Sequence, residues 1–421
     1  MPVLEGWRGH AVDVVVIGAG AAGLAAARHL AERRPDLVVL VLEASDRLGG
    51  RALTLPDLGG LDLGCGWLHG AQDNAWTAIA EASGAGVDRM PAPWNRESKG
   101  AGLAVADREA LNAAMEAFFA RVDAQPDDGA DAALSAQLEP GNRWNAFIGA
   151  VGTYINGVEL DGASTEDLRR YDPGRPPDWR VRGGYGRLIA EYGAPVPVVP
   201  GSAVTRIDHG GAEEILIETV RGALRCRAVV ITVSTTCLAD ETIRFDPPLP
   251  DTLAAAAGVP LGVANKIFLD LAAPEALPEE VYLHGVHDRV STGAYHLRPG
   301  GRPVIEGYFG GQLAREIEAM PPNAATAFAI DELVSRFGSD LRRHLSLRVR
   351  TTWAANPWAR GSYSYARPGQ ADMRAVLATP VGDRLFFAGE ACAPEKFSTA
   401  HGAYETGVAA AAAIASALPA D

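Results

Sequence analysis

Three glycines near the start of the chain, Gly18, Gly20 and Gly23, form a Gly-x-Gly-x-x-Gly motif. The motif follows a β-branched run at 12–17 that predicts a buried strand, and it precedes an alanine-rich stretch at 24–34 that predicts a helix. In that setting the first glycine permits a tight turn, the second lets a pyrophosphate approach the backbone, and the third lets helix and strand pack closely. The pattern predicts that the start of the helix binds the phosphates of a dinucleotide.

Glu43 ends the next predicted strand, 37–42, and lies 20 residues beyond Gly23. A carboxylate there can accept hydrogen bonds from both ribose hydroxyls and would repel a 2′-phosphate, so the site disfavours NADP. The segment 46–51 then supplies a glycine turn with two guanidinium groups, Arg47 and Arg51, suited to a second phosphate or a ribose. For Arg47 a surface ion pair with Asp46 remains open as an alternative.

The other end of the chain has a similar order of elements. A buried strand is predicted at 384–388, Gly389 and Glu390 follow, and an alanine-rich helix is predicted at 403–418. N–H groups at the start of that helix could reach the electron-rich N1–C2=O edge of a flavin.

Five segments of the chain together resemble the motifs of the flavin amine oxidases, the monoamine/polyamine oxidase family, in the family's order: 18–23, 46–51, 181–186, 229–233 and 385–407. The resemblance covers nearly the whole chain. It implies that the bound dinucleotide is FAD and not a nicotinamide cofactor. It implies an α/β fold in which a glutathione-reductase-like FAD-binding Rossmann domain is interleaved with an α+β substrate domain, a mixed sheet flanked by helices. Arg51 is expected at the FAD pyrophosphate and Glu43 at the adenosine ribose. The implied cofactor-binding residues are Gly18, Gly20, Ala22, Gly23, Glu43, Ala44, Arg51, Gly66, Trp67, Val204, Trp358, Gly389, Glu390, Thr399 and Ala400.

Two further segments suggest catalytic residues. The run 63–70 resembles the segment of polyamine and spermine oxidases that follows the flavin and places a histidine, here His69, at the substrate channel. A packed loop histidine is the alternative. Lys266 is the one lysine in an apolar strand at 261–268. The matching lysine of the family holds a water against flavin N5, and a lysine on an exposed strand face is the alternative.

The aromatic turn 353–365 resembles the segment that places an aromatic wall beside the flavin ring. Tyr363 is expected to form one wall of the amine-binding cage and Trp358 to pack near the isoalloxazine, while Trp353 is expected to be structural. Ser362 stands where monoamine oxidases carry the cysteine that bonds the flavin, so the FAD is expected to be non-covalent. Thr399 replaces the second cage aromatic, as in spermine and acetylpolyamine oxidases, which favours a polyamine-type site.

The resemblance therefore implies oxidation of a primary or secondary amine, a polyamine in the first instance, by hydride transfer to flavin N5. The imine would hydrolyse to an aldehyde, and O₂ would be reduced to H₂O₂. An L-amino-acid oxidase or another monoamine oxidase of the same fold is the second interpretation, although the segment after Gly60 lacks the arginine-bearing run that clamps an α-carboxylate. A desaturase-like enzyme or a non-enzymatic scaffold finds less support, because no long apolar tunnel segment or heptad insert is visible.

The strands and helices predicted around these residues indicate two domains that are interleaved along the sequence. The FAD-binding domain is expected at 1–75, 180–260 and 380–421, and the substrate domain at 76–179 and 261–379. Further strands are predicted at 203–208, 214–220, 224–233, 263–271, 304–309 and 345–352. Further helices are predicted at 106–125, 131–138, 312–320 and 324–337.

The composition of the chain limits the classes of protein to which it can belong. With 421 residues, 48% of them hydrophobic and 21% charged, the chain is long enough for two globular domains. A net charge of −14 excludes the basic face that a nucleic-acid binder needs and would suit cationic ligands. Four dispersed cysteines indicate neither a disulfide scaffold nor a metal site. No signal peptide is visible in 1–10 and no apolar run reaches membrane-spanning length, so a cytoplasmic protein without membrane contact is expected, as a monomer or a homodimer.

Overall fold

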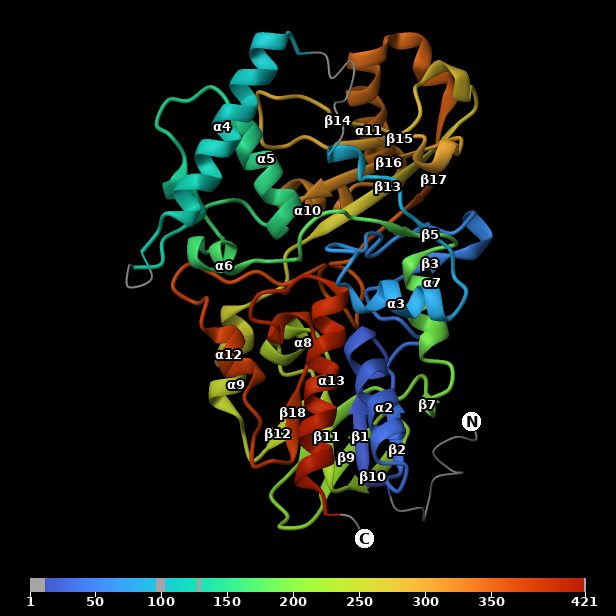
Figure 1. Cartoon of the computed structure of the whole chain (residues 1–421), viewed down its shortest axis with the longest axis vertical. Coiled ribbons are helices and arrows are strands. Elements are labelled where there is room, and N and C mark those ends of the chain that lie inside the picture. Colours follow the sequence, from blue (N-terminus) through green and yellow to red (C-terminus); the bar gives the residue numbers. More distant parts are fainter. Residues whose placement is uncertain (1–11, 96–102, 127–129, 420–421) are drawn as a thin grey trace.

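The computed structural model describes residues 12–95, 103–126 and 130–419. The described chain forms two bodies stacked along the long axis, and the chain passes between them several times (Figure 1). No helix in the described ranges is long and apolar enough to cross a membrane. The segment 1–10, for which the sequence predicts no signal peptide, lies outside these ranges.

A five-stranded parallel sheet organises the lower body, with the order β18-β11-β1-β2-β7. Val14 of β1 pairs with Val39 of β2 on one side and with Ala228 of β11 on the other. Strands far apart in the sequence therefore meet in one sheet. The strands are β1 (Val14–Ile17), β2 (Val39–Leu42), β7 (Val198–Val199), β11 (Ala228–Ile231) and β18 (Leu385–Phe387).

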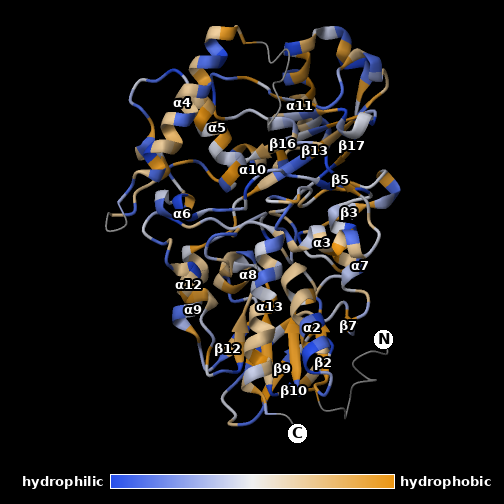
Figure 2. Cartoon of the chain, in the orientation of Figure 1, coloured by the Kyte–Doolittle hydropathy of each residue, from blue (hydrophilic) through white to orange (hydrophobic). Residues whose placement is uncertain are grey.

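Alternate side chains of this sheet enter two different cores. Val14 and Val16 pack with α2 (Ala21–Arg33) and α13 (Ala400–Ala417), whereas Val15 and Ile17 pack toward a second, smaller sheet. Because both faces are covered, the strands are continuous apolar runs, coloured orange in Figure 2. The smaller sheet has the order β10-β9-β8-β12 and consists of β8 (Val204–Asp208), β9 (Ile215–Thr219), β10 (Gly222–Cys226) and β12 (Arg244–Asp246).

The upper body is built on a five-stranded sheet with the order β14-β15-β16-β13-β17. Every pairing in it is antiparallel, where the sequence predicted a mixed sheet. Tyr295 and Phe309 fill its core against α10 (Gly311–Ala319) and α11 (Pro322–Phe337). The strands are β13 (Ala264–Leu271), β14 (Val281–His284), β15 (Ala294–Leu297), β16 (Val304–Gly310) and β17 (Leu345–Arg350).

Two long helices, α4 (Val105–Asp123) and α5 (Asn145–Asn156), stand beside this sheet and share a separate apolar core. The remaining helices are α3 (Ala75–Ala82), α6 (Thr165–Arg170), α7 (Tyr185–Tyr192), α8 (Thr235–Ala239), α9 (Pro250–Gly258) and α12 (Met373–Ala378). The remaining strands are β3 (Thr54–Leu55), β4 (Leu61–Asp62), β5 (Val87–Asp88) and β6 (Arg180–Val181).

Three local predictions need correction. The helix predicted at 131–138 is wrong, because only a 3-10 turn forms there, at Leu134–Gln137. The strand predicted at 224–233 is two strands, β10 and β11, which belong to different sheets. The first and last helices begin three residues earlier than predicted, at Ala21 and Ala400, so each helix starts directly at its glycine-bearing or threonine-bearing turn.

Candidate active site

A continuous cavity of about 1710 Å³ runs from the carboxyl end of the parallel sheet to α4 and α5. Its lining begins at Gly18 and Glu43, passes Lys266, and reaches Phe147 and Tyr154 of α5. Every site residue predicted from the sequence lines this cavity except Gly23. The cavity therefore connects the expected dinucleotide site with the expected substrate site.

The glycine turn shows why each glycine stands where it does. Gly18 has φ +103°, a conformation that side-chain-bearing residues rarely adopt. A Cβ on Gly20 would meet nothing closer than Gly49 O at 4.0 Å, so the space above it is open. A Cβ on Gly23 would lie 1.9 Å from Gly18 O, so Gly23 permits the close contact of turn and helix and does not face the ligand space. Helix α2 has no side-chain cap at Gly20, which leaves its first N–H groups available to a phosphate.

Glu43 is held rigidly at the end of β2. Its Oε2 accepts a hydrogen bond from Ala19 N at 2.7 Å, and its Oε1 accepts from Ser45 N and Ser45 Oγ at 2.8 Å. Ala44 and Val204 line the cavity beside it. An open cradle, an uncapped helix start and a fixed carboxylate fit the pyrophosphate and ribose of a bound dinucleotide.

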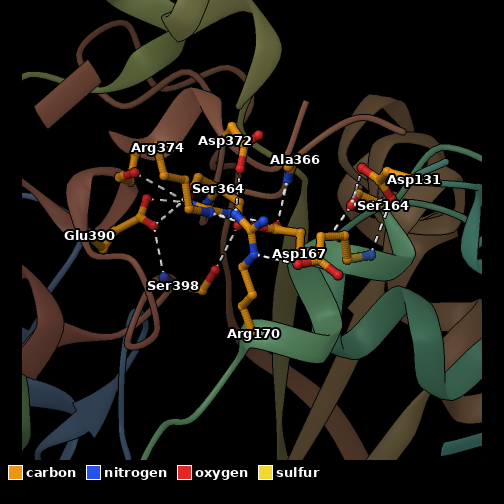
Figure 3. Close-up of polar contacts among 12 residues, drawn as sticks. Asp131, Ser164, Asp167, Arg170, Ser364, Ala366, Asp372, Arg374, Glu390 and Ser398 are labelled. Carbon is orange, nitrogen blue, oxygen red and sulfur yellow. Dashed lines mark hydrogen bonds and ion pairs between the residues drawn. The ribbon is translucent and has the colours of Figure 1, made fainter. Parts of the chain in front are cut away.

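Arg51 and Glu390 line the cavity and belong to a polar network that continues away from it. Figure 3 shows the part of this network that contains Glu390 and Ser364. Arg51 Nη1 lies 2.6 Å from Glu390 Oε1 and donates to Ser362 O at 2.8 Å. Ser364 Oγ donates to Glu390 Oε2 at 2.6 Å and accepts from Arg374 Nη1 at 2.8 Å. The network thus positions the guanidinium that the sequence assigns to the pyrophosphate.

The network ends at a buried ion pair. Arg374 Nε and Nη2 donate to the two carboxylate oxygens of Asp167 at 2.7 and 2.8 Å, and both side chains are almost fully buried. Figure 3 shows Arg374 between Asp167 of α6 and the Ser364–Glu390 pair. One chain of contacts therefore connects a helix of the substrate half with the cofactor end of the cavity.

Lys266 is buried, not on an exposed strand face. Its Nζ lies 2.8 Å from Glu306 Oε1 and donates to Asp62 O at 2.7 Å. Burial disfavours the ammonium form, but the Glu306 carboxylate outweighs it and raises the pKa of Lys266 above its usual range. Burial likewise opposes ionisation of Glu306, and Lys266 nevertheless lowers the pKa of that carboxyl. The two residues therefore form a charged pair at the cavity wall.

Aromatic rings enclose the cavity on the other side of Lys266. Tyr363 and Tyr308 lie with their hydroxyl oxygens 2.9 Å apart, and Tyr363 also donates to the backbone carbonyl of Tyr154. Trp67 packs edge-on against Trp94 with ring centroids 4.5 Å apart. Trp358 lines the cavity with 47% of its surface exposed, whereas Trp353 is buried and donates to Leu63 O.

The cofactor end of the cavity is closed by the start of α13. Thr399 caps the helix by accepting from Gly402 N, and Ala400 accepts from Trp76 Nε1. Gly389 lines the cavity in an extended loop that only glycine favours, φ +146°, and donates to Thr406 Oγ1. Ser362 Oγ is held by Ala264 N and Ala264 O at 2.8 Å, so this position offers no thiol for a covalent flavin link.

His69 lines the cavity near Trp94, and Gly66 and Trp67 of the same segment also line it. His69 Nδ1 lies 3.4 Å from Asp178 Oδ1. Burial favours the neutral acid at Asp178, but the hydrogen bond with His69 outweighs it and lowers the pKa of Asp178. The histidine is thus oriented by a carboxylate and is not merely packed in a loop.

Several residues that line the cavity could not be predicted from the sequence, because no local motif marks them. Tyr308 and Glu306 lie on β16, and Tyr282 and His284 lie on β14, each as an isolated residue in an otherwise ordinary strand. Burial lowers the pKa of His284 to about 3, with His287 and Arg336 adding to the effect. Strand alternation could have placed Glu306 and Tyr308 on one face, but nothing local shows that this face meets Lys266.

Two cysteines, Cys65 and Cys237, line the cavity. Burial raises the pKa of Cys65, which lines the cavity, to about 12, so its thiol is not ionised at neutral pH. Among the described residues no group of histidine, cysteine and carboxylate side chains could hold a metal ion.

Comparison with known proteins identifies the family. The family model of the flavin-containing amine oxidoreductases matches residues 21–415. This chain belongs to that family. The amine oxidase is 28% identical to polyamine oxidase 2 of Arabidopsis thaliana, over 95% of this chain and 87% of the relative, and 28% identical to polyamine oxidase 3 of rice, over 96% and 89%.

A solved structure agrees with this assignment at the level of the fold. Cyclohexylamine oxidase from Brevibacterium oxydans superposes with a TM-score of 0.75 at 22% identity, covering 97% of this chain and 99% of the other. The predicted family, the fold class, the FAD cofactor and the oxidoreductase activity on amines are confirmed. The open cradle at Gly20 and the fixed Glu43 are the features of this chain that fit FAD.

Proposed function

We propose that this amine oxidase acts on a primary or secondary amine that has an apolar body and only one charged nitrogen, with O₂ as electron acceptor and H₂O₂ as product. Bound FAD supplies the hydride acceptor for the carbon next to the nitrogen. Loss of the hydride from that carbon and of a proton from the nitrogen leaves an imine, which water hydrolyses to an aldehyde or ketone.

One observation carries this choice of substrate: the substrate end of the cavity offers no uncommitted carboxylate among the described residues. Glu306 is the carboxylate that lines this end, and Lys266 neutralises it at 2.8 Å. Of the other carboxylates in the lining, Glu43 and Asp46 lie beyond β2, and Glu390 is paired with Arg51. A second ammonium group, as in a polyamine, would be desolvated here without a counter-charge, which costs free energy.

The walls that remain suit an apolar amine. Phe147, Val151 and Ile155 of α5 and Leu111 and Met115 of α4 line the cavity. Aromatic faces also attract a single ammonium group as it enters. The reacting nitrogen must lose its proton before hydride transfer, and no strong base is needed because ordinary amines exchange that proton with water.

The chain's own residues then bind and orient. The Tyr363 and Tyr308 rings form the wall of the amine site, and the Lys266 ammonium, held by Glu306 and Asp62 O, can hold a water molecule at the reacting end. His69, fixed by Asp178, stands at the channel side of the site. These roles position the amine and exclude bulk water.

A polyamine is the second candidate substrate. It is favoured by the similarity to plant polyamine oxidases and by Thr399 at the position where monoamine cages have an aromatic residue. Sequence similarity supports the polyamine, whereas the charge of the cavity lining favours the apolar monoamine. A cytoplasmic location stays a prediction.

Anaerobic reduction of the bound flavin, followed by its visible absorbance, separates the candidates. The purified holoenzyme is mixed with hexylamine, benzylamine, cyclohexylamine, spermidine, spermine and L-leucine, and the rate of bleaching divided by the apparent Kd is compared. We expect at least about a tenfold preference for a monoamine, a free-energy difference of about 1.4 kcal/mol. A preference for spermidine or spermine would favour the second candidate instead. Bleaching by none of the amines would overturn the proposed function.

A further inference from the structure

We propose that the Tyr308 hydroxyl oxygen accepts a hydrogen bond from an N–H of the substrate amine and thereby orients it for oxidation. The inference rests on the proposed amine oxidation and adds a positioning group for its substrate. Tyr308 is on β16, outside the motif segments from which the family resemblance is drawn.

Strand register places Tyr308 at the reacting end of the cavity. In the β13–β16 pair, Lys266 is directly opposite Tyr308. Both residues line the cavity, as does Tyr363, whose hydroxyl oxygen lies 2.9 Å from that of Tyr308. A substrate nitrogen near Lys266 and the Tyr363 wall is therefore also near the Tyr308 hydroxyl.

The direction of the Tyr308–Tyr363 hydrogen bond follows from counting protons. Each phenol has one proton, and burial raises the pKa of both hydroxyls, so both keep it at neutral pH. Tyr363 donates its proton to the backbone carbonyl of Tyr154 at 2.5 Å, and a carbonyl can only accept. In the bond between the two hydroxyls, Tyr308 must therefore donate and Tyr363 accept.

The Tyr308 oxygen consequently presents only lone pairs to the cavity. In the described part of the chain no N–H or O–H group donates to it. Lys266, the nearest cation in the strand register, points its ammonium at Glu306 Oε1 and Asp62 O. A ligand that brings an N–H would complete the hydrogen bonding of this oxygen, whereas a ligand that brings an acceptor would be repelled.

An acceptor suits amine oxidation better than a donor does. When the C–H bond breaks and the hydride leaves with its electron pair, the nitrogen lone pair forms the C=N π bond. A hydroxyl that donated to the nitrogen would bind this lone pair and oppose the reaction. A hydroxyl that accepts from N–H leaves the lone pair free and strengthens as positive charge develops on nitrogen, which is selective stabilisation of the transition state.

The test uses two unreactive ligands that carry the same alkyl group. A tert-alkyl primary amine has N–H groups but no α-hydrogen, so it binds without being oxidised; its N,N,N-trimethyl analogue has the same carbon skeleton, a permanent charge and no N–H. Their Kd values are measured by calorimetry with the wild-type holoenzyme, Y308F and the matched control Y192F. Tyr192 is a tyrosine of α7 that does not line the cavity.

We expect Y308F to weaken binding of the primary amine by roughly tenfold while leaving the Kd of the trimethyl analogue unchanged. Y192F should alter neither value. Flavin reduction by a reactive primary amine should slow by at least the same factor in Y308F. Equal Kd changes for both ligands, or no change for the primary amine, would overturn the inference. In either case reduction of the wild-type flavin by a reactive amine tests the proposed function separately.

Discussion

Lys266 and Glu306 form an ion pair 2.8 Å long between two neighbouring strands, β13 and β16, at the wall of the cavity. The pKa of Glu306 is lowered, so its contribution to stability is present above its ordinary value of 4.5 and is lost as the pH falls through the folded-state pKa. The pKa of Lys266 is raised, so its contribution is present below its ordinary value of 10.5 and is lost as the pH rises through the folded-state pKa. The pair therefore stabilises the fold throughout the neutral range.

Glu306→Gln should be destabilising and should change the titration of Lys266. The buried ammonium would lose its counter-charge, so we expect a loss of about 3 kcal/mol at pH 7 and a fall in the pKa of Lys266. Urea unfolding measures the loss, and the pH dependence of flavin reduction measures the titration. The double variant K266M/E306Q should be more stable than E306Q. An E306Q enzyme as stable as wild type would show that the pair contributes nothing.

Arg108→Glu should shift substrate preference toward polyamines. Arg108 is on α4 and lines the substrate end of the cavity, so the substitution introduces the carboxylate that this end lacks. We expect flavin reduction by spermidine to gain about tenfold relative to reduction by hexylamine. R225E makes the same change of net charge on β10, away from the cavity, and should leave the ratio unchanged. An equal shift in both variants would point to overall charge as the cause.

Gly20→Ala and Gly23→Ala should separate FAD binding from folding. The space at Gly20 is open and its φ is −84°, so the alanine fits the FAD-free protein but enters the space of the pyrophosphate. We expect unchanged stability of the FAD-free protein and at least about tenfold weaker FAD binding. At Gly23 the new Cβ meets Gly18 O at 1.9 Å, so both stability and FAD binding should suffer. Fluorescence titration with FAD and thermal unfolding distinguish these results. A G20A protein that binds FAD normally would contradict this placement of the cofactor.

Asp167→Asn should destabilise the protein and also weaken FAD binding. The substitution leaves the buried Arg374 guanidinium without its carboxylate, at a cost of about 3 kcal/mol or more, and disturbs the network that holds Glu390 and Arg51. The matched control is D372N, because Asp372 is an exposed partner of Arg170 and its loss should change stability by less than about 1 kcal/mol. Thermal unfolding with and without FAD measures both effects. Similar losses in both variants would argue against a special role of the buried pair.

His284 should make the folded protein sensitive to mild acid. Burial lowers its pKa to about 3, so between pH 6.5 and 3 the unfolded chain binds a proton that the folded chain does not. Stability must therefore decrease as the pH falls below 6.5, by up to about 2 kcal/mol at pH 5 from this residue. H284Q should flatten the dependence of Tm on pH between 7 and 5. An unchanged slope would show that His284 does not contribute.

The cofactor half of the site was predictable because its signals are local. Gly18, Gly20, Gly23 and Glu43 are within one strand–turn–helix–strand unit, whose geometry is fixed by short-range sterics and by the strand period. Lys266 was also found, because a lysine in an apolar strand needs a partner. The partner itself, Glu306, could not be predicted, since the antiparallel register that joins β13 and β16 depends on tertiary packing.

Most residues at the substrate end of the cavity could not be predicted either, because they too are brought together by tertiary packing. Tyr308, Tyr154 and His284 come from β16, α5 and β14, and each looks unremarkable in its own segment. The 3-10 turn at Leu134–Gln137 shows a second limit, because alanine-rich composition predicts helix even where backbone contacts to Ala163 and Leu160 fix another conformation. Helix propensity is a weak signal that tertiary contacts override.

The order of strands in the parallel sheet also constrains how the protein is made. β18 and α13, which complete the sheet of β1 and pack against α2, follow the whole antiparallel sheet in the sequence. The parallel sheet therefore cannot be completed before β18 has been made, whereas the antiparallel sheet of β13 to β17 can form earlier. The apolar edge of β11 stays unpaired until β18 has been made, so a truncation that removes β18 should leave an exposed strand edge and an aggregation-prone chain.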